Sequence, residues 1–137
     1  MKYWLLKSEP DVYPWSKLVA DGRGKWDGVR NHTAKLNLQA MKKGDRAFFY
    51  HSNIGKEIVG TMEIVREAYP DTSAEKGAWF MVDVAPLKEA AKPLTLAEIK
   101  TLPELAGMAL LKYSRLSVQP VAPAEWKAIC KRIGVPA

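Results

Sequence analysis

Three short polar segments in the first half of the chain carry the side chains best suited to bind a ligand. They are Lys7-Ser8-Glu9-Pro10, Trp26-Asp27-Gly28-Val29-Arg30-Asn31 and Tyr50-His51-Ser52-Asn53. Each segment places hydrogen-bonding groups near an aromatic residue at the point where an apolar run ends. Groups of this kind read the edge of a nucleobase while aromatic rings hold its faces. We therefore predict that the three segments line one binding pocket.

Four side chains of these segments offer hydrogen-bond donors and acceptors to a ligand: Ser8, Asn31, His51 and Ser52. Three of them also have a structural interpretation that the sequence leaves open. Ser8 suits a turn before Pro10, and Asn31 suits the N-cap of a helix. His51 suits a strand end, where the fold itself would satisfy its ring nitrogens. We expect a shared cleft because these residues stand at the ends of adjacent elements.

Trp26 is the aromatic residue that we expect to touch the ligand. It lies between two glycines and has charged neighbours on both sides, which predicts a loop position. An indole in a loop can stack on a planar base, and such stacking contributes about 1–3 kcal/mol per base in nucleic-acid binders. The alternative is a tryptophan folded over the end of the core as a lid. Trp4, Trp15 and Trp126, by contrast, are expected in the core.

The net charge of +6 is concentrated in the first half of the chain. Residues 1–66 hold 12 Lys and Arg side chains against 7 Asp and Glu, a balance of +5. A basic face beside a pocket suits a partner that carries phosphate groups. We expect Lys7 and Arg30 to contact phosphate. A solvated lysine surface is the alternative that charge alone leaves open.

The sequence gives little indication of catalysis or metal binding. The sequence has no nucleophile elbow, P-loop or dinucleotide fingerprint, and no obvious acidic residue stands near His51 in the sequence to orient it. The single cysteine, Cys130, forbids an internal disulfide and favours a reduced, cytoplasmic setting. With only two histidines as well, we expect no metal site and no cofactor. No apolar run approaches the length that spans a membrane.

Local patterns predict an α+β fold built from short strands and short helices. Helices are expected to begin near Pro14, Asn31, Thr95 and Pro123. Strands are expected at residues 3–6, 47–50, 58–65, 79–85 and 116–121. The irregular order of these elements favours a small barrel with helices packed outside over a parallel βαβ sheet. The length of 137 residues suggests one domain, residues 1–137.

Several spaced motifs resemble the EVE domain family. They are residues 1–10 (MKYWLLKSEP), 26–31 (WDGVRN), the Gly44-Asp45 turn into 49–53 (FYHSN), 58–60 (IVG), 80–84 (FMVDV) and 116–118 (LSV). The resemblance runs nearly from end to end of the chain. It implies a PUA-like fold, a small mixed β-barrel with short helices outside, which YTH domains share. It also implies a reader of modified bases in DNA or RNA rather than a catalyst.

The resemblance further indicates which residues would line the pocket. They are Lys7, Ser8, Trp26, Val29, Asn31, Tyr50, His51 and Ser52, with Leu116 and Ser117 at the far wall. By this interpretation Trp26 stacks on the base or caps it, while Ser8, Asn31 and His51 read its edge.

Two other functions stay open at this point. The first is a small hydrolase acting on a modified nucleoside, with Lys7, Glu9 and His51 as candidates for acid–base work. The second is a small-molecule or protein-binding module on the same fold with an incidental basic face. Turnover of a nucleoside would identify the first, and a flat salt dependence of oligonucleotide binding would favour the second.

Overall fold

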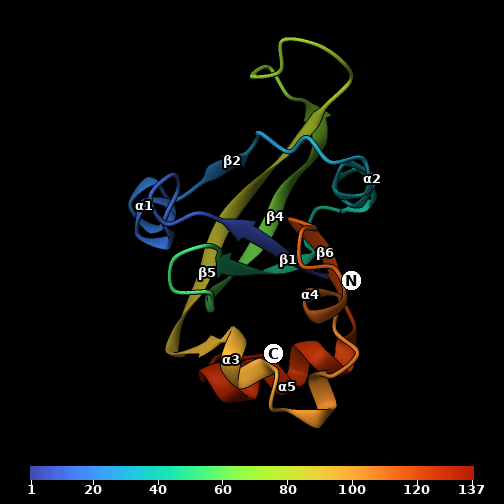
Figure 1. Ribbon diagram of the computed structural model, residues 1–137. Helices are drawn as coiled ribbons and strands as arrows, with labels where there is room; N and C mark the ends of the chain where they lie inside the picture. Colours follow the sequence, from blue (N-terminus) through green and yellow to red (C-terminus); the bar gives the residue numbers. More distant parts are fainter.

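The computed structural model describes all 137 residues and combines one six-stranded sheet with five α-helices and one short 3-10 helix (Figure 1). The strands are β1 (Tyr3–Ser8), β2 (Gly24–Trp26), β3 (Arg46–His51), β4 (Glu57–Pro70), β5 (Phe80–Thr95) and β6 (Val118–Val121). The helices are α1 (Trp15–Asp21), α2 (His32–Ala40), α3 (Leu96–Ile99), η1 (Pro103–Leu105), α4 (Ala109–Lys112) and α5 (Pro123–Ile133).

The strands pair in the order β2-β5-β4-β3-β1-β6. The β1–β3 pair is parallel and all other pairs are antiparallel. The predicted α+β class is confirmed, but the predicted closed barrel is not formed, because β2 and β6 are the two edges of the sheet and do not pair with one another. The long β4–β5 ladder is interrupted by several register shifts, which let strands of this length bend around the core.

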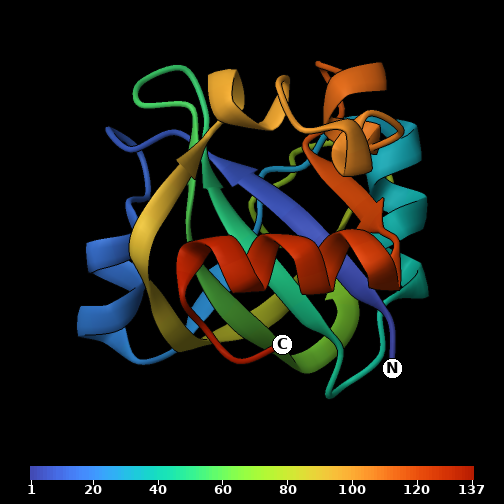
Figure 2. The ribbon, with the colours of Figure 1, turned by 90° about the horizontal axis from the view of Figure 1, so that it is seen from below.

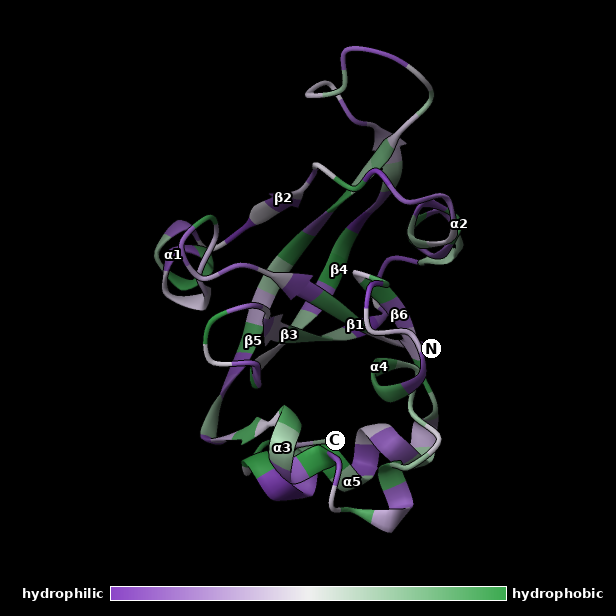
Figure 3. Ribbon diagram, in the orientation of Figure 1, coloured by the Kyte–Doolittle hydropathy of each residue, from purple (hydrophilic) through white to green (hydrophobic).

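Alternate side chains of the central strands enter two separate cores, one on each face of the sheet. In β3, Ala47 and Phe49 join the first core, while Phe48 and Tyr50 join the second. This follows from the two-residue period of a strand, whose successive side chains point to opposite faces. The central strands are accordingly rich in hydrophobic residues along their length (Figure 3).

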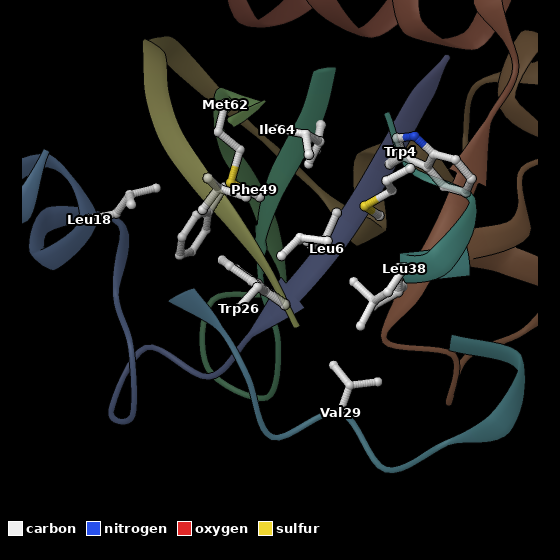
Figure 4. Close-up of a cluster of buried hydrophobic side chains, with 14 of the residues drawn as sticks. Trp4, Leu6, Leu18, Trp26, Val29, Leu38, Phe49, Met62 and Ile64 are labelled. Carbon is white, nitrogen blue, oxygen red and sulfur yellow. The ribbon is translucent and has the colours of Figure 1, made fainter. Parts of the chain in front are cut away.

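Helices cover the sheet on different sides. Helix α5 crosses one face, where Trp126 is fully buried and stacks on Phe48 with ring centroids 4.0 Å apart (Figure 2). Helices α1 and α2 flank the other core and contribute Leu18 and Leu38 to it (Figures 1 and 4). The ring of Trp15 packs on the backbone of β4 so closely that a Cβ at Gly60 would lie 2.6 Å from it.

Most of the predicted elements are confirmed, and their lengths differ from the prediction. The helix predicted after Asn31 starts where expected, and Thr95 forms the predicted capping box with Glu98. Pro14 precedes α1 as its N-cap, and Gly22 ends that helix in the left-handed conformation with φ of 72°. Strands β4 and β5 extend well beyond the predicted ranges, whereas β6 begins two residues later than predicted. No helix of the structure has both the length and the apolar character needed to cross a membrane.

Candidate binding site

The C-terminal end of β1 is the point where the predicted segments meet. The carbonyl of Ser8 accepts a hydrogen bond from the backbone N–H of Ser52 at 2.9 Å. The backbone N–H of Lys7 donates to the carbonyl of Ser117, also at 2.9 Å. His51 lies beside Ser8 in the parallel β1–β3 ladder. Backbone bonds therefore bring together two of the three predicted segments, those at Lys7–Ser8 and His51–Ser52, and they add Ser117 from the predicted far wall.

Two cavities lie on either side of the Lys7 side chain. The smaller has a volume of about 270 Å³ and is lined by Lys7, Ser8, Val12, Tyr13, Lys25, Trp26 and Asp27. The larger has a volume of about 660 Å³ and is lined by Asn31, Thr33, Asn37, Ala109, Lys112, Tyr113, Ser114, Arg115, Leu116 and Pro120. The Nζ of Lys7 donates to the carbonyl of Ser114 at 2.8 Å, so this side chain connects the two cavities. Burial lowers the pKa of the Lys7 ammonium.

Trp26 does not occupy the predicted loop position. It is the last residue of the three-residue strand β2, and only 6% of its surface is exposed. Its ring packs edge-to-face against Phe49 with centroids 5.3 Å apart, and it lies among the core side chains in Figure 4. The remaining exposed part of Trp26 contributes to the lining of the smaller cavity. Its main role is to fill the core, and a free stacking surface is the wrong description of it.

Ser8 is bonded to the segment before α1 and His51 to the first residue of α1, rather than to one another. The Oγ of Ser8 donates to the carbonyl of Tyr13 at 2.7 Å, which is the predicted turn role. The backbone N–H of Trp15 donates to Nε2 of His51 at 3.1 Å. Burial lowers the pKa of His51, which keeps this nitrogen available as an acceptor. The two side chains therefore hold the α1 end against the sheet and do not form a nucleophile–base pair.

Asn31 has both a structural bond and a free group at the larger cavity. Its Oδ1 accepts from the backbone N–H of Ala34 at 2.9 Å, which confirms the N-cap prediction. The amide nitrogen Nδ2 donates to no protein group, and the residue lines the larger cavity. An asparagine amide has two donors as well as its acceptor oxygen. Asn31 is thus able to cap α2 and to donate hydrogen bonds into the cavity at the same time.

Arg30 is held by a buried carboxylate. Its Nη1 lies 3.1 Å from Oδ2 of Asp71, whose side chain has no exposed surface, and its Nη2 donates to Oγ of Ser73 at 3.3 Å. The backbone N–H of Gly28 donates to the same Asp71 oxygen at 2.9 Å. Burial alone would raise the pKa of Asp71, but hydrogen bonds from Ser73, Gly28 and Arg30 lower it from 3.8 to about 2. Arg30 therefore joins the β2–α2 connection to the β4–β5 loop.

Replacing Asp71 by asparagine is expected to lower the free energy of unfolding by about 2 kcal/mol at neutral pH, the value that corresponds to this pKa difference. The folded-state pKa lies below the unfolded one, so the stabilisation is complete above 3.8 and is lost as the pH falls toward 2. Urea unfolding of the parent and of Asp71→Asn at several pH values measures this difference. The difference in free energy of unfolding between the two proteins should shrink below about pH 4. A difference that does not depend on pH would contradict the lowered pKa of Asp71.

Two residues of the predicted pocket lie inside the protein instead. Tyr50 is 3% exposed and belongs to the core beneath α5, on the sheet face opposite to Phe49, and burial raises its pKa to about 12. Val29 is 6% exposed and packs in the first core with Trp26 (Figure 4). These two side chains support the fold around the site and do not line either cavity. Ser52 and Ser117 take part through their backbones, and Leu116 lines the larger cavity.

The sequence interpretation missed most of the larger cavity. Thr33 and Asn37 follow Asn31 along α2, and four further lining residues, Lys112, Tyr113, Ser114 and Arg115, form one polar run before β6. The mixed basic and polar character of residues 112–115, directly before a predicted strand, was the available signal. In the smaller cavity Tyr13 was missed: its ring meets Trp26 edge-on at 6.3 Å, and its buried hydroxyl has no hydrogen-bond partner.

Solved structures place this arrangement among known folds. The chain is similar to Rpa0253 from Rhodopseudomonas palustris, with 57% identity, a TM-score of 0.92 and coverage of 98% of this chain and 94% of that one. It shares its fold with the YTH domain of the Zygosaccharomyces rouxii MRB1 protein, at a TM-score of 0.61 and 14% identity, over 96% of this chain and 86% of that one. The implied fold relationship to YTH domains is therefore confirmed.

The chain is also similar to thymocyte nuclear protein 1 from mouse and to human THYN1. Mouse thymocyte nuclear protein 1 is 38% identical over 161 residues, which include 93% of this chain and 71% of the mouse protein. The structure of human THYN1 in complex with 5-methylcytosine-containing DNA matches with 34% identity and a TM-score of 0.86, over 100% of both chains. The model of the EVE domain matches residues 2–132. The chain therefore belongs to the EVE domain family.

Proposed function

We propose that this protein binds a nucleic-acid strand and accommodates one modified base in the larger cavity. Asn31 carries the proposal, because it lines a cavity of about 660 Å³ and its amide nitrogen has no protein partner while its oxygen caps the helix. The amide would hydrogen-bond the edge of the base. The side chain of Leu116 would offer an apolar contact to an added methyl group, as apolar side chains do for the methyl of thymine.

The human relative supports this choice of ligand. THYN1 was solved in complex with DNA that contains 5-methylcytosine, and it matches this chain over its whole length. We infer that methylated cytosine in DNA is the first ligand to test for this protein.

The charges around both cavities favour a phosphate-bearing ligand. Lys7 and Lys25 line the smaller cavity, and Lys112 and Arg115 line the larger one. Asp27 is the only acidic residue in either lining. An electrostatic surface of this kind attracts a polyanion and supplies most of the sequence-independent part of nucleic-acid affinity. The smaller cavity is then a suitable place for the part of the strand next to the bound base.

We also infer that the open, curved sheet is a variant of the PUA-like architecture, which the fold shared with a YTH domain supports. The reducing, cytoplasmic setting stays a prediction from cysteine usage. Cys130 is buried in α5, and burial raises the pKa of its thiol to about 11, which fits a structural thiol with no redox role.

Oligonucleotide affinity is expected to fall steeply with salt. If the four basic residues of the cavities each neutralise one phosphate, affinity for a duplex should fall roughly a hundredfold between about 50 and 200 mM salt. Fluorescence anisotropy with a labelled oligonucleotide at several salt concentrations gives this slope. An affinity that does not change with salt would favour a small-molecule or protein-binding module, and release of a product from a modified nucleoside would favour the hydrolase.

A further inference from the structure

Three cationic or titratable side chains surround one indole beside the larger cavity. The Nζ of Lys35 lies 5.3 Å from the ring centroid of Trp79, and the guanidinium carbon of Arg30 lies 5.7 Å from it. The imidazole of His32 lies 5.2 Å from the same ring at an angle of 34°. Distances below about 6 Å are typical of cation–π contacts. We call Arg30, His32, Lys35 and Trp79 the indole patch.

Two residues of the indole patch, Arg30 and Trp79, are held in place by hydrogen bonds to Asp71. The carboxylate of Asp71 holds Arg30, and the backbone N–H of Asp71 donates to the carbonyl of Trp79 at 2.9 Å. This bond closes the β4–β5 loop at its base, and the loop lies above the β2–α2 connection in Figure 1. The Cβ of any residue at position 77 would lie 3.0 Å from the Trp79 ring nitrogen, which explains the glycine there. The patch is therefore a positioned surface rather than a chance meeting of long side chains.

Two residues of the indole patch are the chain neighbours of a residue that lines the proposed base site. Arg30 and His32 stand on either side of Asn31, which lines the larger cavity. Both are exposed, while Lys35 and Trp79 are half-buried. Lys35 takes part in none of the four ion pairs of the protein. The patch therefore presents one uncompensated ammonium, the unused N–H groups of Arg30 and an imidazole, and two of these three residues adjoin Asn31 in the chain.

We propose that the indole patch binds the sugar–phosphate backbone next to the base held in the larger cavity. Lys35 and Arg30 contact phosphate, and His32 adds a hydrogen bond to the backbone of the strand. The ring of Trp79 stabilises the two cations through cation–π contacts and packs against the sugar. This inference rests on the proposed function, since it assumes that a nucleic-acid strand enters the neighbouring cavity. Contacts of this kind position the strand and carry no sequence or modification information.

The test compares Lys35→Gln and Trp79→Leu with the control Lys127→Gln. Lys127 is exposed on α5, which packs on the opposite face of the sheet, and its replacement makes the same change in net charge. Affinity is measured for methylated and unmethylated DNA of one sequence at four salt concentrations. Lys35→Gln should weaken binding of both oligonucleotides by the same factor, about threefold to tenfold, and lower the salt slope by about one. Trp79→Leu should weaken binding of both oligonucleotides equally. Lys127→Gln should have the same affinities and salt slope as the parent.

The outcomes separate this inference from the proposed function. If Lys35→Gln and Lys127→Gln give the same affinity and the same salt slope, the indole patch does not contact the nucleic-acid backbone. The proposed function still stands in that case if the unmutated protein prefers methylated DNA. If Lys35→Gln changes the ratio of the two affinities, the patch reads the base and the inference is wrong. If the parent binds without preferring the methylated strand, the proposed function fails, and the Lys35 and Lys127 comparison still decides the patch. A parent that binds no nucleic acid overturns both.

Discussion

Replacing Trp26 by alanine is expected to destabilise the protein by about 3–5 kcal/mol, the range typical of a buried tryptophan or phenylalanine. Trp26 is 6% exposed and contacts Phe49 and Tyr13 edge-on, so its removal leaves a cavity that rigid neighbours cannot fill. For a chain of this length the loss corresponds to a drop in melting temperature of roughly 10–20 °C. Thermal unfolding followed by circular dichroism measures it directly.

Trp126→Ala provides the reference for a fully buried tryptophan, because Trp126 lies on the buried face of α5 and is 0% exposed. The two variants should lose stability to a similar extent. If Trp26→Ala melts at the temperature of the parent but no longer binds oligonucleotide, Trp26 is a ligand-facing residue and the packing shown in Figure 4 is not its main role. Binding by Trp26→Ala is interpretable only at temperatures where the variant is folded.

Asn31→Asp is expected to leave stability unchanged and to reduce oligonucleotide affinity about a hundredfold, or about 2.7 kcal/mol. Aspartate caps a helix as well as asparagine, so the bond to the Ala34 N–H is kept. The carboxylate has no donor to replace the free Nδ2 group, and its charge opposes a phosphate nearby. Chemical denaturation and anisotropy titrations of the same preparation measure the two effects separately.

Gln39→Glu is the matched control for this substitution. It makes the same amide-to-carboxylate change at an exposed position near the other end of α2, outside the lining of either cavity. Its affinity for oligonucleotide should stay within about a factor of two of the parent, the effect of one distant screened charge. If Asn31→Asp binds as tightly as Gln39→Glu, Asn31 is only a helix cap and does not belong to the site.

Features set by local sequence were predictable. The caps at Asn31 and Thr95 follow from side chains that bond the first free N–H groups of a helix, a preference that acts over three residues. The same holds for the apolar face of α5, whose Trp126 and Ile129 are buried as its spacing requires. The meeting of the Lys7–Ser8 and Tyr50–His51 segments was also predicted, and it arises because the ends of β1 and β3 lie side by side in the sheet.

Features set by tertiary pairing were not predictable in the same way. Strand β2 has three residues and exists only because it pairs with β5, so nothing local distinguished Trp26 from a loop residue. Tyr50 follows Phe49 in the chain and therefore faces the other side of the sheet, because successive side chains of a strand alternate between faces. The predicted set of pocket residues did not take this alternation into account. The closure of a barrel likewise depends on whether β2 and β6 meet, which no local pattern determines.

The proposed function requires that this EVE domain bind a modified base more tightly than its unmodified parent. The most direct measurement is the affinity of the protein for two DNA oligonucleotides that differ only in one 5-methyl group on cytosine, as single strands and as duplexes, at one fixed salt concentration. A methyl group in an apolar contact contributes about 1–3 kcal/mol, so we predict at least about tenfold tighter binding of the methylated strand in one of the two forms. Equal affinities for methylated and unmethylated DNA in both forms would contradict the account.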